Sequence, residues 1–277
     1  MTNSSASAQI PLDDVAVLLP AYNGQADVDL TLASFSESAL VHVLIVDDGS
    51  TLPIVAPTIP NMKIDVLRMA QNGGIERALQ AGIDTLAARG FRYAARIDAG
   101  DRSVPQRLAR QRVFMELHPR VAGLGMWTQV VTRNGQPLFF MLTPPAEPNA
   151  VRRLRFFRSC LAHPSMMLRI DAVREVGNYR AEYRSAEDLD LFVRLMERYD
   201  CANLPELGLY YELNEGGISA TRRRRQVNST LRLQLRYFNA LNPYDWLGLA
   251  KNLLHLVTPY RALQRVKRVL LAPRAGR

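Results

Sequence analysis

Short unbroken apolar runs alternate with segments of helical spacing along the first part of the chain. Four of these runs have the length and composition of buried strands, at residues 15–19, 41–46, 64–69 and 93–97. The intervals between and after them have helical patterns, at residues 27–38, 75–89 and 105–117. Apolar strands that alternate with helices are typical of a parallel sheet covered on both faces. The pattern therefore predicts an α/β fold, with ligands at the carboxyl ends of the strands.

From residue 121 onward the pattern changes. Residues 121–132 and 137–142 flank Asn134-Gly135, which predicts a β-hairpin with a type I′ turn. Other segments of this part are predicted as a basic helix over 149–158 and as strands over 164–169 and 201–213. After Ser185 we expect an amphipathic helix, whose core face is formed by Leu189, Phe192, Val193 and Met196.

The last part of the chain contains only helical patterns. Three amphipathic segments are expected there, over 226–241, 244–257 and 260–271. In the first segment Leu231, Leu235 and Phe238 fall on one stripe, with Arg232 and Arg236 beside it.

Composition indicates a folded globular protein. The chain has 277 residues, of which 48% are hydrophobic and 22% charged. It contains no apolar run of about 18 residues, and its first dozen residues lack the pattern of a signal peptide. Cys160 and Cys201 lie far apart without metal-type spacing, so reduced core cysteines and a cytoplasmic location are expected.

Charge is distributed unevenly along the chain. The net charge is +9, but residues 222–277 hold thirteen Lys and Arg against one acid, Asp245, so the remainder is mildly acidic. This tail can be a solvated basic face, or an interfacial anchor in which Phe238 and Trp246 meet a membrane while arginines attract anionic headgroups. No motif of nucleic-acid recognition supports nucleic acid as a partner.

Candidate chemistry begins with two loops that follow buried strands. Asp47-Asp48-Gly49-Ser50 can accept hydrogen bonds from a uracil N–H or from ribose hydroxyls. Asp98 and Asp101 lie three residues apart in the other loop and can hold a divalent cation that bridges a diphosphate. Both loops are also compatible with ordinary turns, in which the carboxylates bond the local backbone.

Glu187 and Asp188 form a third candidate. A carboxylate that faces a pocket can remove the proton from an acceptor hydroxyl as a general base. The alternative is helix capping, because residues 185–188 match a capping box in outline and acids are favoured in a first helical turn.

Five short segments, taken in their order along the chain, match the motifs of a known family. They are Val-Ala-Val-Leu-Leu-Pro-Ala-Tyr-Asn at 15–23, Val-Asp-Asp-Gly-Ser at 46–50, Asn-Gly-Gly-Ile at 72–75, Asp-Ala-Gly-Asp at 98–101 and Ala-Glu-Asp-Leu-Asp-Leu at 186–191. Together they resemble the family 2 glycosyltransferases of the GT-A fold, and His163-Pro164-Ser165 and residues 107–111 also fit. The resemblance covers about residues 14–220.

The resemblance implies a fold and a division of the chain. A Rossmann-like, mostly parallel central sheet flanked by helices is expected, with a basic helical C-terminal extension. Residues 1–13 would be a flexible tail, 14–105 the nucleotide-sugar-binding half, 106–221 the acceptor-binding half of the same domain and 222–277 the extension.

The resemblance also implies a reaction, in which a sugar is transferred with inversion from a nucleotide donor to a glycan or lipid-linked acceptor. UDP is the expected nucleotide, and individual residues acquire roles in this transfer. Asp188 would be the catalytic base, and His163 and Glu187 would lie in the acceptor or donor pocket. The donor nucleotide sugar would contact Pro20, Ala21, Tyr22, Asp47, Asp48 and Asp98. Surface polysaccharide or lipopolysaccharide synthesis is the expected setting, on the inner face of a membrane contacted through residues 222–277.

Two departures from the family pattern affect the metal. Gly100 stands where the family commonly has the second Asp of Asp-x-Asp, and Asn214 stands where it often has a histidine. A cofactor Mg²⁺ or Mn²⁺ is therefore not expected by default. A bound cation would lie on Asp98 and Asp101; without one, Arg102 would supply part of its charge.

Two alternatives to a glycosyltransferase remain. A sugar nucleotidyltransferase would share the N-terminal sheet, but residues 20–24 lack the Gly-rich, basic loop usual there. A non-catalytic nucleotide-sugar-binding or scaffold protein would be consistent with the loss of the second Asp of Asp-x-Asp at Gly100. The complete motif around Asp188 instead favours an enzyme.

Overall fold

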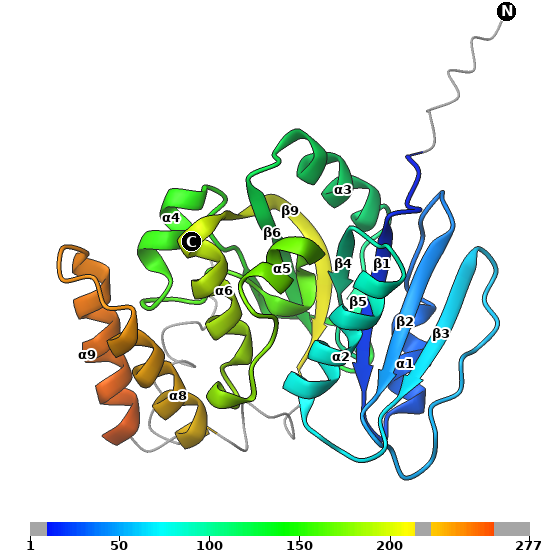
Figure 1. Cartoon of the computed structure of the whole chain (residues 1–277), viewed down its shortest axis with the longest axis horizontal. Helices are drawn as coiled ribbons and strands as arrows, with labels where there is room; N and C mark the ends of the chain where they lie inside the picture. Colours follow the sequence, from blue (N-terminus) through cyan, green and yellow to red (C-terminus); the bar gives the residue numbers. More distant parts are fainter. Residues whose placement is uncertain (1–9, 214–222, 258–277) are drawn as a thin grey trace, which may run out of the picture.

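A computed structural model describes residues 10–213 and 223–257 of the chain (Figure 1). Within them one nine-stranded sheet has the order β3-β2-β1-β4-β8-β6-β9-β5, with β7 paired to β6. In chain order the strands are β1 Val15–Ala21, β2 Val41–Asp47, β3 Met62–Arg68, β4 Tyr93–Arg96, β5 Arg102–Ser103, β6 Val121–Val131, β7 Pro137–Leu142, β8 Met167–Arg169 and β9 Asp200–Glu212.

The sheet is parallel in its first half and mixed in its second. Strands β3, β2, β1 and β4 run parallel, as the four apolar runs predicted. Strand β8 then pairs antiparallel with both β4 and β6, while β6 and β9 form a long parallel pair. The carboxyl ends of β1, β2 and β4 therefore lie at one edge of the sheet, which places the loops after them close together.

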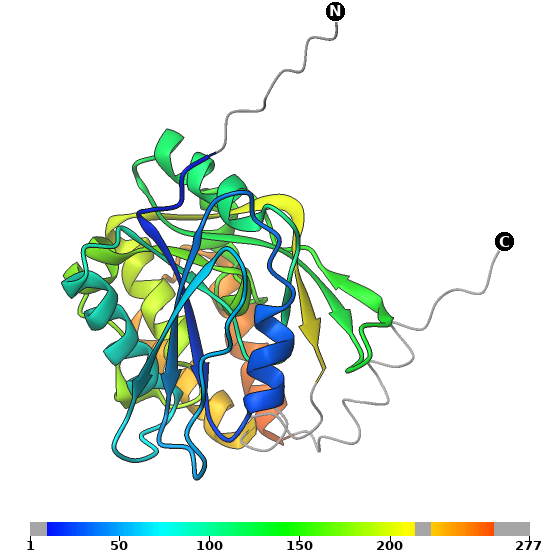
Figure 2. The ribbon, with the colours of Figure 1, turned by 90° about the vertical axis from the view of Figure 1, so that its right-hand side faces the viewer.

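Helices cover both faces of this sheet, as predicted. On one face, buried side chains of α2 (Ile75–Ala88), α5 (Ile170–Glu175) and α6 (Glu187–Arg198) pack on alternate residues of β1 and β2. On the other, α1 (Gln25–Leu32) and α3 (Arg107–Leu117) pack on the remaining ones. Figure 2 shows α1 (blue) and α2 (teal) on opposite sides of the strands.

The hairpin formed by β6 and β7 is confirmed, but its predicted type I′ turn is wrong. A type I′ turn requires positive φ at both central residues. Here Gly135 has a φ of 78°, whereas Asn134 is not among the residues with positive φ. The Gly135 amide donates to the carbonyl of Thr132 (2.8 Å), and the Thr132 amide donates to Gln136 (2.9 Å). The positive-φ glycine therefore follows the turn and restores the strand pairing.

The C-terminal helices α8 (Arg223–Arg236) and α9 (Pro243–Val257) form a hairpin beside α4 (Pro148–Leu154), at the end of the molecule away from β3 (Figure 1). The stripe predicted for α8 is partly wrong, because Leu231 and Leu233 are buried whereas Leu235 is exposed. The third predicted segment, 260–271, lies outside the described residues. No helix in the described ranges is long and apolar enough to cross a bilayer.

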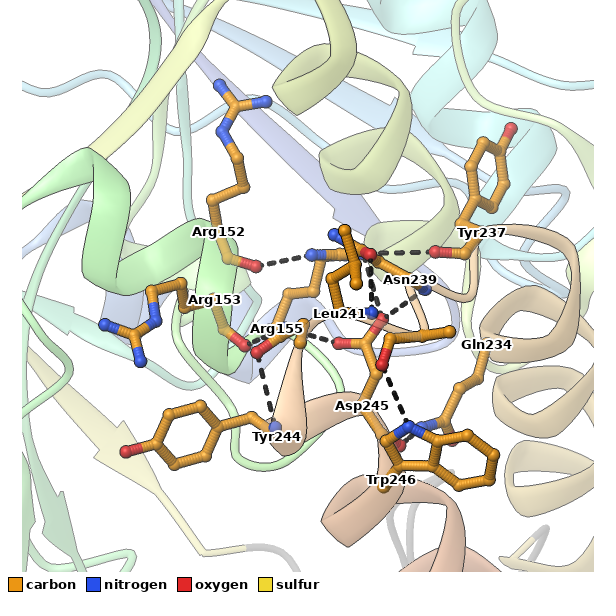
Figure 3. Close-up of polar contacts among 12 residues, drawn as sticks. Arg152, Arg153, Arg155, Gln234, Tyr237, Asn239, Leu241, Tyr244, Asp245 and Trp246 are labelled. Atoms are coloured by element: carbon orange, nitrogen blue, oxygen red, sulfur yellow. Dashed lines mark hydrogen bonds and ion pairs between the residues drawn. The ribbon is translucent and has the colours of Figure 1, made fainter.

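A buried carboxylate attaches this hairpin to the body (Figure 3). Asp245 of α9 is fully buried and forms an ion pair with Arg155, at 3.2 Å. Its oxygens also accept hydrogen bonds from the Asn239 amide (2.9 Å) and the Asn242 side chain (2.6 Å). Gly248 lies against the carbonyl of Phe156, where a Cβ would come within 2.6 Å of the oxygen. The extension is therefore packed into the same unit as the sheet.

Candidate functional site

A cleft of about 480 Å³ lies at the carboxyl ends of β1 and β2. Asp48 lines it, together with three residues that the sequence placed at the donor: Pro20, Ala21 and Tyr22. The two carboxylate oxygens of Asp48 accept hydrogen bonds from the amides of Gly73 (2.8 Å) and Gly74 (2.9 Å). These bonds hold the 72–75 motif against the cleft, which also receives Arg184 and Arg225.

Asp47 has a different position from its neighbour. It is fully buried, outside the cleft lining, and its oxygens accept the amides of Ser50 (2.9 Å) and Ile54 (3.2 Å) and an Arg68 guanidinium (3.0 Å). Burial alone would raise the pKa of Asp47, but the hydrogen bonds from Ser50 and Ile54 and the charge of Arg68 outweigh it and lower that pKa. Asp47 therefore shapes the loop, and the structure does not bring it to the donor cleft.

Asp98 is paired with an arginine that the sequence analysis did not select. Arg96 of β4 is almost completely buried and donates to the Asp98 carboxylate at 2.5 Å and to the carbonyl of Ile97. Its charge reaches several groups at this edge of the sheet and lowers the pKa of Asp188 and Glu187 against the effect of their burial. A charged residue inside an otherwise apolar strand was the available signal in the sequence.

Asp101 points away from the site. It is buried, and one of its oxygens accepts the backbone amide of Glu212 at 2.9 Å. Burial, followed by the negative charge of Asp98, raises the pKa of Asp101 well above its usual value and so favours the neutral form of this carboxyl group. Between the two acids Gly100 has a φ of 101°, a conformation that L side chains rarely adopt.

These observations test whether the loop fits a divalent cation. Hard cations bind ionised carboxylates and other exposed oxygens. Here Asp98 is already paired with Arg96, and one oxygen of the buried Asp101 is taken up by the Glu212 amide. No group of three potential ligands occurs within residues 10–213 and 223–257, and Asn214 lies outside those ranges. The residues present therefore do not fit a resident metal on Asp98 and Asp101.

The third acidic pair begins helix α6. The predicted capping box is wrong, because the N-cap is Ala186, no side chain caps the helix, and Ser185 has a φ of 65°. The Asp188 carboxylate instead accepts the amide of Leu189 at 2.7 Å. One Glu187 oxygen, Oε2, is buried with no hydrogen-bond partner among the described atoms.

The two acids of this pair differ in protonation. Burial, together with the charge of Asp188, raises the pKa of Glu187 to about 8, so Glu187 carries a proton near pH 7. Burial also raises the pKa of Asp188, but hydrogen bonds from the Leu189 amide and its own amide and the charge of Arg96 oppose that rise. Asp188 is therefore the member of the pair that is ionised first and can accept a proton.

A second cavity, of about 290 Å³, is lined by Asp188, which is not among the residues that line the first cleft. Its walls come from residues 155–161, from α6, and from α8 and α9, which contribute Gln226, Val227, Thr230, Lys251, Asn252 and His255. Ser185 lines both this cavity and the donor cleft, so the two spaces adjoin at the start of α6. The sequence predicted either a solvated basic face or a membrane anchor for these helices, and gave no sign that they line a cavity.

Two further predicted residues lie apart from the cavities. His163 is buried, and its Nε2 is 2.7 Å from the hydroxyl of Tyr179. Burial and the charge of Arg96 hold the pKa of His163 well below its usual value, so the ring is neutral. Arg102, expected to replace the cation, donates to the carbonyl of Arg133 instead. Cys160 and Cys201 are free and buried, as predicted.

Comparison with known proteins adds a family and a set of relatives. The model of the glycosyl transferase family 2 matches residues 16–177. The amylovoran biosynthesis glycosyltransferase AmsE of Erwinia amylovora is 26% identical over 201 residues, which are 69% of this chain and 73% of that protein. The O-antigen biosynthesis glycosyltransferase WbnJ of Escherichia coli is 28% identical over 114 residues, or 41% of this chain and 42% of that protein.

Solved structures share the architecture. Residues 1–349 of S. aureus TarS, in complex with UDP-GlcNAc, match with a TM-score of 0.63 and 17% identity, over 95% of this chain and 76% of that chain. The mannosyltransferase PcManGT from Pyrobaculum calidifontis, in complex with GDP-Man and Mn²⁺, matches with a TM-score of 0.61 and 16% identity, over the same shares. At this identity the likeness concerns the fold, and the predicted GT-A architecture is confirmed.

Proposed function

The chain belongs to the glycosyl transferase family 2 and is a glycosyltransferase, and from this premise we propose that it transfers a sugar from a UDP-sugar donor to a glycan or lipid-linked acceptor with inversion at the anomeric carbon. Two observations carry the proposal: Asp188 lines the second cavity, and this cavity adjoins the cleft at Asp48 through their shared residue, Ser185. The cleft at Asp48 takes the donor, and the cavity beside α8 and α9 takes the acceptor.

Asp188 acts as the general base in this reaction. Its carboxylate takes the proton from an acceptor hydroxyl while that oxygen bonds to the anomeric carbon. The bond between this carbon and the nucleoside diphosphate breaks on the opposite face. Glu187 holds its own proton and cannot compete for this one, because its pKa is raised to about 8. Fixing the two substrates in adjoining cavities supplies much of the rate.

The leaving diphosphate is stabilised by positive charge from the protein. Arg184 and Arg225 line the donor cleft, and Arg184 is held by an ion pair with Glu76 at 3.2 Å. Fixed cationic groups aimed at developing negative charge lower the barrier to its departure. We infer that these arginines replace Arg102 in the role expected for it, and that transfer proceeds without a metal on the Asp98 loop. Full activity in excess chelator is expected; complete loss with rescue by Mn²⁺ would contradict this inference.

The setting follows from the relatives. AmsE and WbnJ are named for amylovoran and O-antigen biosynthesis. We place this chain in the assembly of a surface polysaccharide or lipopolysaccharide, at the cytoplasmic face of a membrane. A basic extension fits that place, since cationic segments are attracted by anionic lipids.

The test compares two isosteric variants of neighbouring residues. Asp188→Asn removes the base, and we expect about 10²–10⁴-fold slower transfer with unchanged UDP binding. Glu187→Gln is the matched control, because it replaces a group that is already neutral, and it should keep activity within about tenfold. Loss in Glu187→Gln with retention in Asp188→Asn would reverse the assignment. UDP binding without turnover of donor in the native chain would favour a binding protein.

A further inference from the structure

Helix α9 has its polar side chains toward the protein and its apolar side chains toward the outside. Its buried positions are Asp245, Gly248 and Asn252, which recur every three or four residues. Its exposed positions include Trp246, Leu247 and Leu253, each at least half exposed. A surface helix normally shows the reverse arrangement, with its apolar stripe on the core.

Specific contacts explain the polar inner face. Asp245 is neutralised by Arg155 (Figure 3). Asn252 donates to Gln234 of α8 at 2.9 Å, and Gly248 allows close approach to residue 156. The helix is therefore oriented by buried hydrogen bonds and an ion pair. Its apolar side is held outward by these contacts and does not result from poor packing.

The exposed side forms one surface, which we call the α9 outer face. It consists of the half or more exposed apolar residues of α9 and of the turn before it: Leu241, Trp246, Leu247, Leu253 and Leu254. Contiguous apolar surface of this kind is typical of an interaction site. The Trp246 ring also contacts Phe238 edge-on, with ring centroids 4.8 Å apart, so part of the face has a fixed shape.

Charge around this face indicates which partner fits it. Arg153 of α4 is exposed, and its guanidinium carbon lies 5.4 Å from the centre of the Tyr244 ring at the start of α9. The sequence that follows, residues 258–277, contains six Lys and Arg and no acid. Two copies joined through this face would bring like charges together, which disfavours self-association. Tryptophan and leucine bordered by arginine instead match the boundary between headgroups and acyl chains of an anionic bilayer.

We propose that the α9 outer face lies on the surface of an anionic membrane, with Trp246, Leu247 and Leu253 inserted at the headgroup level. The opposite side of the same helix carries Lys251 and Asn252, which line the cavity beside Asp188. A helix with its side chains is about 10 Å across, so the cavity lies about one helix diameter from the bilayer. This rests on the proposed function and deepens it, because a lipid-linked acceptor would reach the base without leaving the membrane.

Vesicle flotation of the full chain tests the proposal. The probes are phosphatidylcholine vesicles with and without about one-third phosphatidylglycerol. We expect the native chain to float with the anionic vesicles and about tenfold less with the neutral ones. Trp246→Ser/Leu247→Ser/Leu253→Ser should lower partitioning at least about tenfold. The matched control, Leu52→Ser/Leu117→Ser, changes highly exposed leucines elsewhere and should float like the native chain.

Three outcomes decide between the explanations. Unchanged melting of the triple variant with lost flotation supports the membrane face, and equal flotation of the triple variant overturns it. If sedimentation velocity shows that the native chain is a dimer and that the triple variant is not, the face binds a second copy of the chain. That result would overturn the membrane proposal as well. Asp188→Asn should float normally, so failure of the membrane face and failure of the proposed transfer are distinguishable.

Discussion

The loops at 47–50 and 98–101 have similar sequences and opposite electrostatics. Each follows a parallel strand, carries two acids and contains a glycine with positive φ. In each loop one acid points inward and the other lies nearer the site. The inward acid of the first loop, Asp47, is ionised and bonded to Arg68. The pKa of the inward acid of the second, Asp101, is raised well above its usual value, which favours its neutral form.

The difference shows that the number of acids in a loop does not determine its charge. Asp47 has enough donors around it to remain ionised despite burial, whereas Asp101 has one backbone donor and a negative neighbour in Asp98. The first loop can therefore present Asp48 to a nucleotide on a fixed frame. The second loop supplies little negative charge beyond what Arg96 cancels, which is why a divalent cation is not expected there.

The largest contrast is expected between the two glycines. A Cβ on Gly49 would lie 2.4 Å from the backbone carbon of Gln71, in addition to the strain of a φ of 69°. On Gly100 its nearest neighbour would be a Glu212 oxygen at 3.7 Å. Gly49→Ala should lower the free energy of unfolding by more than about 4 kcal/mol and Gly100→Ala by about 1–3 kcal/mol, measured by urea denaturation. Equal losses would contradict the described packing of the first loop.

The next largest contrast in stability is expected between the two inward acids, Asp47 and Asp101. Asp47→Asn removes a charge that is fully buried and paired, and should destabilise the fold by about 2–3 kcal/mol. Because burial favours the neutral form of Asp101, Asp101→Asn should cost less than about 1 kcal/mol at pH 7. Denaturation of both variants at pH 7 gives the comparison. A larger loss in Asp101→Asn would mean that Asp101 is ionised.

Asp48 should affect binding more than folding. Asp48→Asn can keep only one of its two bonds to the Gly73 and Gly74 amides, and it loses its charge toward the cleft. We expect about tenfold weaker UDP binding by calorimetry, equivalent to about 1.4 kcal/mol. Asp98→Asn serves as the comparison. The Asp98 carboxylate is paired with Arg96, and Asp98 is not among the residues that line the donor cleft. An equal loss of UDP affinity in Asp98→Asn would place Asp98 at the nucleotide as well.

The smallest effect concerns pH. The folded-state pKa of Asp101 is raised, so its contribution to stability is complete below the unfolded pKa of about 4 and is lost as pH rises through the folded value. Asp101→Asn lacks this dependence. Its free energy of unfolding relative to the native chain should therefore increase from pH 5 to pH 8. Asp47 has a lowered pKa and acts in the opposite sense, losing its contribution as pH falls below about 4.

Much of the first half could be predicted from the sequence because its strands are uniformly apolar. Strands β1 to β4 begin within two residues of the predicted positions, and Pro20, Ala21, Tyr22 and Asp48 do line one cleft. Those contacts follow from loops that join neighbouring parallel strands, a local consequence of topology.

The parts that could not be predicted depend on distant contacts. The pKa of Asp101 is raised by burial that depends on the whole fold, and its one backbone donor, Glu212 of β9, lies more than a hundred residues away in sequence. The stripe expected on α8 is partly wrong because Leu233, and not Leu235, packs into the main core of the protein. Residues 185–188 match a capping box by spacing, but the positive φ of Ser185 prevents it, and no composition rule reveals that angle.

The attachment of α8 and α9 to the body has a consequence for how the protein becomes active during synthesis. The donor cleft is formed mainly by residues 20–78, which leave the ribosome early, although Arg184, Ser185 and Arg225 complete it. Lys251, Asn252 and His255 of the second cavity emerge later, after the sheet is complete. Until Asp245 meets Arg155, a nascent chain has most of the first cleft and lacks one wall of the second cavity. If the second cavity takes the acceptor as proposed, competence for transfer is acquired only after residue 255 has been synthesised.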